Sequence, residues 1–502
     1  MREHRLWLRE QNMELKRVEA ERVRLAWDSL VRGVSFSTLH VRQRALAILA
    51  DDYIRRAQDL QETPSPELRS WSKRCEGLAF RLLAQIDPNA RNARITLRRD
   101  PGIVALVRAR NHFLASSNVD EQQFAWQKLS NAFRIASPAL RRYASELEQM
   151  TQKWGSTDFL TSALAARGLS KQQVEEWFLS FLTENNSLAD ADHPWENLHP
   201  LGVNQIAPNC RYPEEKTVVS TLEGLGFQRS SIDAIPLVKL SKAKKVPWAL
   251  CFAIDPPSDV RIVTTNGTGF NYVTALLHEF GHALYFSNIS AEDLADLQEP
   301  PQFVEGVAFA FELLAFSVDW LTEYTDLYDS AEKASTQLWR LYLNDLRWVI
   351  LEALFELYLF DSLSVDAYEL WSQLAYHLEF AVPGIGAGHS LLATDETARP
   401  LRYLDYALGR LIGLHSFSNL SKAFSKIEKA EALRTIYFHG GAFVPWIDKV
   451  RAFTGEWPPL SVSNAVGLSF TPHNKTFGHS VGKWSNNDCR GQTHQEREQT
   501  TA

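Results

Sequence analysis

The sequence predicts a mainly α-helical protein with one small β-sheet. Apolar residues recur every three or four positions from residue 1 to about 190 and again from 272 to about 450, which is the period of an amphipathic helix. The clear β signal is limited to two short runs of β-forming residues, 248–254 and 260–265, separated by a turn that contains two prolines. We therefore expect a small sheet just ahead of the second helical part.

Changes in composition divide the chain into three regions. Residues 1–195 form a helical N-terminal region, in which turn signals such as Asp87-Pro88 and Asp100-Pro101 separate the helices. Residues 196–460 contain the predicted sheet and the second helical part. Residues 461–502 are poor in aliphatic side chains and rich in Asn, Gln, Ser, Thr and Gly, which predicts a loosely ordered tail.

Composition excludes several classes of protein. The 502 residues include 53 Lys and Arg against 60 Asp and Glu, and this net charge of −7 argues against a general nucleic-acid partner. No segment has the roughly 20 consecutive apolar residues of a membrane span, and the N-terminus lacks a secretory apolar core. The four cysteines are widely separated, which fits a reducing compartment. We expect a soluble cytoplasmic protein without a nucleic-acid or membrane partner; the oligomeric state stays open.

The chemically informative motif is His278-Glu279-Phe280-Gly281-His282. On a helix, residues four positions apart lie on one face, so both imidazoles can bind one Zn²⁺. Glu279 is placed to act as a general base that takes a proton from the attacking water and later delivers it to the leaving amine. The structural alternative is a pair of core histidines that hydrogen-bond to carbonyls.

A third metal ligand is expected downstream, because catalytic zinc usually has three protein ligands and one open position. Glu305 and Glu312 are seven residues apart in a segment otherwise rich in Phe, Val and Ala, so they share one helix face. We predict that Glu305 binds the metal and that Glu312 lies behind it and orients a ligand histidine. The alternative is that both carboxylates face solvent.

These motifs resemble zinc oligopeptidases of the oligoendopeptidase F and thimet oligopeptidase type. The resemblance covers roughly residues 245–460. It includes the zinc helix at 278–284, the two glutamates, a tyrosine-rich segment at 400–408 and a Gly-Gly to Trp-Pro pattern at 440–458. It implies a mostly helical metallopeptidase fold with a deep channel, one Zn²⁺ per chain, and short peptides as substrates.

The resemblance also implies roles for residues beyond the metal ligands. Tyr403 or Tyr406 would stabilise the oxyanion, and His389 would do likewise; the alternative is that the two tyrosines are ordinary core residues. The sequence departs from the family pattern in four places: Tyr285 replaces a further histidine, residues 307–309 replace Pro-Ser-Gln, His389 lies farther upstream than expected, and Arg402 replaces an aromatic residue.

Together these observations predict a zinc metalloendopeptidase that hydrolyses internal bonds of short oligopeptides. The strand at 260–265 is expected to offer an edge to an extended substrate. One alternative is a metallocarboxypeptidase of the thermostable type, because Asp259-Val-Arg261 is similar to a motif of that family, although its threonine is displaced to Thr264. A second alternative is a noncatalytic peptide-binding protein on the same scaffold.

Overall fold

The computed structural model is mainly helical with one three-stranded sheet, so the predicted fold class is confirmed. In the described part of the chain, none of the helices is long and apolar enough to cross a bilayer. The structure describes residues 2–32, 43, 45–50, 55, 66–116, 119–155, 158–184, 208–240, 249–265, 267–290, 297, 299–377, 400–421 and 426–458. The predicted tail at 461–502 lies outside these ranges.

The N-terminal region consists of long helices that begin where the sequence places turn signals. Asp87 caps one helix by accepting hydrogen bonds from the N–H groups of Asn89 and Ala90, and Asp100 caps the next by accepting one from Gly102. Proline occupies the first helical position in both, where no N–H is needed. The helices are α1 (Arg2–Arg32), α3 (Pro66–Ile86), α4 (Pro88–Arg99), α5 (Pro101–Ala115), α6 (Val119–Lys153), α7 (Phe159–Ala165) and α8 (Lys171–Glu184).

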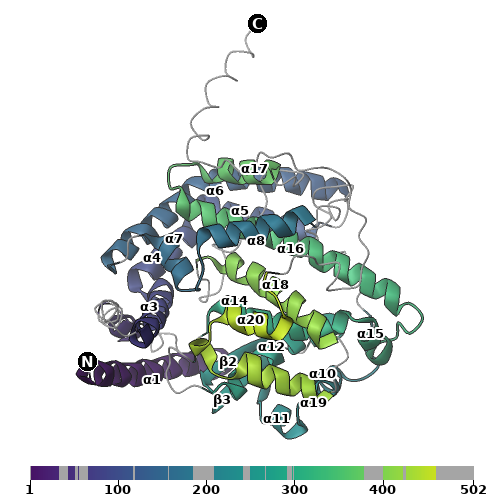
Figure 1. Ribbon diagram of the computed structural model, residues 1–502. Helices are drawn as coiled ribbons and strands as arrows, with labels where there is room; N and C mark the ends of the chain where they lie inside the picture. The colour runs from purple at the N-terminus through teal and green to yellow at the C-terminus, as the bar shows by residue number, and fades with distance from the viewer. Residues whose placement is uncertain are drawn as a thin grey trace.

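The second region contains the sheet and further helices, of which α17 (Ala367–His377) lies beside α6 of the N-terminal region (Figure 1). Its strands are β1 (Leu237–Leu240), β2 (Ala249–Asp255) and β3 (Asp259–Thr265). Its α-helices are α10 (Glu214–Gly224), α11 (Arg229–Asp233), α12 (Phe270–Asn288), α14 (Pro301–Glu312), α15 (Val318–Tyr324), α16 (Ala331–Asp361), α17 (Ala367–His377), α18 (Arg402–Ser421), α19 (Lys426–Ala432) and α20 (Trp446–Thr454). Short helical turns are η3 (Leu313–Phe316), η4 (Leu433–Phe438) and η5 (Gly441–Phe443).

The strand order corrects one expectation. The order is β1-β3-β2, with β3 parallel to β1 and antiparallel to β2, so β3 is central and has no free edge for a substrate. The sequence did not reveal β1, because four residues are too few to show a strand period. Within the described residues β1 and β2 each pair with β3 alone, so β2, like β1, is an edge strand.

The sheet is covered on both faces because its side chains alternate. Ile254 and Val263 pack with Trp27 of α1 on one face. Ile262 points to the other face, where α12 packs against β2 and β3. Figure 1 shows the end of α1 beside β2 and β3. The N-terminal helix is therefore part of the sheet layer, although more than 200 residues separate it from these strands in the sequence.

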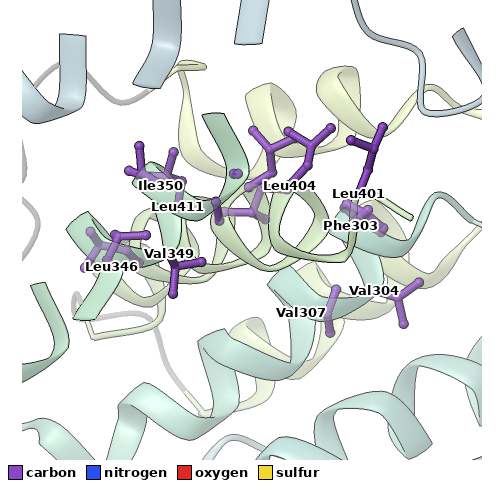
Figure 2. Packing of buried hydrophobic residues seen from close by; sticks show 14 of the residues in the cluster. Phe303, Val304, Val307, Leu346, Val349, Ile350, Leu401, Leu404 and Leu411 are labelled. Carbon is purple, nitrogen blue, oxygen red and sulfur yellow. The ribbon is translucent and has the colours of Figure 1, made fainter. Parts of the chain in front are cut away.

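The core lies where α14 is enclosed by its neighbours. α14 packs against α12 and α18, and α18 packs in turn against α16. Figure 2 shows Phe303 and Val307 of α14 in one apolar cluster with Leu404 of α18 and Ile350 of α16. This packing fixes the α14 backbone on two sides. It therefore also fixes the positions from which Glu305 and Glu312 extend.

Candidate metal centre

Helix α12 presents the HExxH side chains from one face. His278 and His282 are one turn apart, and their ring centroids are 4.9 Å apart. Both side chains are largely buried, at 14% and 13% exposure. Their immediate neighbours along the helix are apolar and buried, among them Leu277 and Ala283. Two adjacent imidazoles in such surroundings need polar partners.

Helix α14 supplies the partner. The Glu305 carboxylate oxygen Oε2 is 3.4 Å from His278 Nε2 and 3.7 Å from His282 Nε2. One ligand atom from each of the three residues lies within 4.8 Å of the others. The structure therefore brings together the three residues that the sequence analysis selected as metal ligands.

The spacing of these atoms fits a zinc ion. Zinc binds nitrogen and oxygen ligands at about 2.0–2.2 Å in a tetrahedron, which places neighbouring ligand atoms about 3.4 Å apart. The two measured separations, 3.4 and 3.7 Å, are close to this value. A direct charge-assisted hydrogen bond would bring the atoms to about 2.7–2.9 Å. Two imidazoles and one carboxylate are also the donor types of catalytic zinc sites.

Glu312 lies behind His278. Its Oε2 is 3.0 Å from His278 Nδ1, so the Nε2 atom of the same ring remains directed toward Glu305. Such a hydrogen bond fixes the tautomer and the orientation of a ligand histidine. Phe309, on the same helix, packs edge-on against the His278 ring at a centroid distance of 4.9 Å.

Glu279 faces the sheet rather than the α14 glutamates. Its Oε2 accepts a 2.6 Å hydrogen bond from the backbone N–H of Cys251 in β2. Burial raises the pKa of Glu279, the nearby His278 lowers it, and the charge of Glu305 raises it. The net result is a pKa of about 7. The carboxylate is thus held beside the two histidines by the edge strand.

The charges of this cluster are strongly coupled. Burial by itself lowers the pKa of His278, but the nearby carboxylates of Glu305, Glu312 and Glu279 raise it, to about 10 overall. A dication that binds between His278, His282 and Glu305 must displace the proton that these acids hold on the imidazole.

The structure separates the two candidate tyrosines. The Tyr406 ring lies 6.3 Å from Phe309, the residue that contacts His278, and its hydroxyl accepts a 2.9 Å hydrogen bond from Arg402. Tyr403, one turn earlier on α18, has other neighbours: burial raises its pKa well above the usual value, Glu352 raises it further and Arg110 lowers it. His389 lies outside the described residues.

Comparison with solved structures identifies the fold. No family model matches the sequence, and no curated protein is similar enough to count as a relative. The chain superposes on PZ peptidase A with a TM-score of 0.62 at 14% identity, covering 88% of each chain. A Bacillus anthracis structure assigned as an oligoendopeptidase F gives 0.58 at 14% identity, over 88% of this chain and 86% of that chain. The M32 carboxypeptidase of Deinococcus radiodurans R1 gives 0.56 at 14% identity, over 92% and 97%.

The chain adopts this metallopeptidase fold. The resemblance to oligoendopeptidase F structures that the motifs indicate is confirmed at the level of the fold. Both peptidase classes among the similar structures share the fold, so fold alone does not distinguish an endopeptidase from a carboxypeptidase.

Sequence reasoning missed the glycines that bring the helices of this metallopeptidase fold together. A Cβ at Gly281 would lie 2.8 Å from the Ala308 backbone of α14, and one at Gly409 would lie 2.7 Å from Glu305 Cβ. Real Cβ atoms are not found at such distances. The sequence does contain a hint, since Gly281 lies inside the HExxH motif. Only the packing shows that the helix it allows to approach closely is α14.

Proposed function

We propose that the chain is a zinc-dependent metallopeptidase that hydrolyses internal bonds of short peptides. The observation that carries the proposal is the cluster of His278, His282 and Glu305, in which the Glu305 oxygen lies 3.4 and 3.7 Å from the two histidine nitrogens, close to the separation of neighbouring ligands in a tetrahedral zinc site. The fold shared with solved metallopeptidases supports it.

The proposal assigns a role to each side chain. Zinc, when bound, supplies a Lewis acid for the scissile carbonyl. Glu279 takes a proton from the attacking water and returns it to the leaving amine, while the Cys251 N–H keeps the carboxylate in place. Glu312 orients His278. Tyr406, or Tyr403 in its stead, donates a hydrogen bond to the developing oxyanion, and His389 is kept as a further candidate.

The edge of β2 supports extended peptides as substrates. Because the Cys251 N–H points to Glu279, Cys251 faces away from β3, and the alternation of an antiparallel pair gives Ala253 the same direction. The N–H and C=O of Ala253 are thus placed to pair with a peptide backbone beside the metal ligands. Backbone pairing of this kind tolerates many sequences.

The decisive experiment replaces the proposed general base. Glu279→Gln should retain about one zinc per chain, because Glu279 is not a ligand in the proposal, and should hydrolyse a quenched fluorescent peptide at least about 100-fold more slowly. Glu332→Gln, at an exposed position of α16, is the matched control and should behave as wild type. Undiminished turnover in Glu279→Gln would refute the mechanism, and no hydrolysis by the zinc-loaded wild type would favour the noncatalytic peptide-binding alternative.

A carboxypeptidase is the second candidate. The chain covers almost the full length of two carboxypeptidase structures, 97% of the M32 carboxypeptidase chain of Deinococcus radiodurans R1 and 98% of the Pyrococcus furiosus carboxypeptidase chain. Against it, Arg261 of the carboxypeptidase-like motif is bonded to Asp259 at 2.7 and 2.9 Å and stacks on Trp27. Mass spectrometry of products from a free-acid peptide and its C-terminal amide separates the two, since a carboxypeptidase should reject the amide.

A further inference from the structure

A cavity of about 230 Å³ adjoins the proposed metal centre. Glu305 forms part of its wall, together with Val304 and Pro301 at the start of α14. The end of β2, from Ala253 to Pro256, forms a second wall, and Phe286 and Leu297 form a third. The remaining wall comes from α1, through Lys16, Glu19 and Ala20.

Among the described residues that line the cavity, each ionisable side chain has a counter-charge. Lys16 is 3.9 Å from Asp255, and Glu19 forms a two-point ion pair with Arg22 at 2.6 Å. Glu299 is ion-paired with the buried Lys449, and Glu305 faces the two histidines. The rest of the lining is apolar or backbone. A charged group that entered would lose its hydration without gaining an opposite charge, which costs free energy. An apolar group would pay little desolvation free energy on entering.

The wall from α1 is held in place by contacts outside the cavity. Trp27 packs edge-on against Phe252 with ring centroids 5.4 Å apart, and Arg24 is ion-paired with Asp259 at 3.4 Å. Trp27 also joins the apolar layer under the sheet. Ala20 lies two turns before Trp27, so its position relative to β2 is fixed by this packing.

We propose that this cavity is a specificity pocket for one uncharged apolar side chain of the peptide substrate, and that Ala20 of α1 limits its depth. A peptide that pairs with the outward backbone groups of Ala253 places alternate side chains on either side of the strand plane, and Ala253 itself lines the cavity. The proposal rests on the proposed function and adds the side-chain selectivity that the metal ligands do not provide.

The test compares substitutions that add the same ring inside and outside the cavity. Ala20→Phe fills the pocket, whereas Met13→Phe adds the ring at a position of α1 that is 64% exposed. Both variants and the wild type, loaded with zinc, are assayed on matched peptides in which one position at a time carries Ala, Leu, Phe, Lys or Asp. Zinc content and thermal midpoint are recorded for each.

The wild type should prefer Leu or Phe to Lys or Asp at one position by about tenfold or more in kcat/KM. At that position Ala20→Phe should lower the ratio of the Leu or Phe peptide to the Ala peptide by about tenfold, since the added ring takes the space. Met13→Phe should keep the wild-type ratios. Unchanged ratios in a folded Ala20→Phe protein would overturn the proposal of a specificity pocket. If Ala20→Phe does not fold, Ala20→Leu is used for the same comparison.

Failure of the pocket and failure of the catalytic proposal are distinguishable. The same peptides, carrying a fluorophore, are titrated into Glu279→Gln protein with and without Ala20→Phe, and binding is followed by anisotropy. Loss of the Leu or Phe preference in binding supports the pocket even if no peptide is hydrolysed. An identical binding profile with and without Ala20→Phe refutes the pocket even if hydrolysis is observed.

Discussion

At the scale of single residues, the site is a small set of acids that hold two imidazoles in a defined orientation. Glu312 contacts His278 Nδ1 and Glu305 lies at Nε2, so each nitrogen of that ring has its own carboxylate. Glu279 is set apart from both by its bond to the Cys251 N–H. The three glutamates thus lie next to three different groups: His278 Nδ1, His278 Nε2 and the Cys251 N–H. In our proposal they have three different roles.

Glu312 provides a test of the orienting role. Glu312→Gln keeps a group of the same shape but removes the charge beside His278 Nδ1, so zinc affinity should fall by about 10- to 100-fold. Competition with a chromophoric chelator measures the dissociation constant, and Glu332→Gln is the control. A wild-type affinity in Glu312→Gln would show that the 3.0 Å contact does not orient a ligand.

The tyrosines can be ranked by their surroundings. Phe309 contacts both the Tyr406 ring and the His278 ring, and the Tyr406 hydroxyl accepts a hydrogen bond from Arg402, whereas Tyr403 has Glu352 and Arg110 as neighbours. Tyr406→Phe should therefore lower kcat by at least about tenfold with little change in KM. Tyr403→Phe should have the smaller effect on kcat. The reverse order in steady-state kinetics would assign the role to Tyr403.

At the scale of elements, the site depends on how closely α14 approaches its two neighbours. Gly281 lets α12 approach α14, and Gly409 lets α18 approach α14 from the other side at Glu305. The HExxH pattern and the spacing of Glu305 and Glu312 could be read from the sequence because a helix fixes them locally. The distance between the two helices could not, because it depends on contacts between residues far apart along the chain.

Gly409→Ala tests this packing. The new methyl group would lie 2.7 Å from Glu305 Cβ, so Glu305 or the helix must move. We expect zinc affinity to fall by about tenfold or more and stability to fall by about 1–3 kcal/mol. Gly224→Ala is the control, since a Cβ there meets no atom within 4 Å. Calorimetric zinc titration and thermal unfolding of both variants measure the difference. Equal zinc affinity and stability in Gly409→Ala and Gly224→Ala would contradict the role given to Gly409 in helix packing.

At the scale of the whole molecule, the N-terminal region contacts the second region in two places. α1 completes the layer under the sheet and lines the cavity beside Glu305. Farther away, Glu352 of α16 is buried at 6% exposure, near Arg110 of α5 and Tyr403 of α18. Burial raises the pKa of Glu352 well above its usual 4.5, Glu356 raises it further, and Arg110 lowers it.

Glu352 makes stability depend on pH. Since its pKa is higher in the folded than in the unfolded chain, the folded state is favoured below the ordinary pKa of 4.5 and loses this advantage as pH rises through the folded value. Glu352→Gln removes the ionisation, so it should raise the thermal midpoint relative to wild type at pH 8 and much less near pH 4.5. Glu332→Gln, exposed on the same helix, should show no such trend. A gain that is equal at both pH values would contradict this account.

The sequence by itself determined the helical class, the two strands of the hairpin, and the identity of the proposed ligands, because helix periodicity and the four-residue spacing of His278 and His282 are local properties. The tertiary structure alone decided that β2 rather than β3 has an open edge, that Tyr406 lies beside Phe309, the neighbour of His278, and that α1 lines the cavity. These features depend on which distant segments pack together, and that is set by side-chain packing over the whole core.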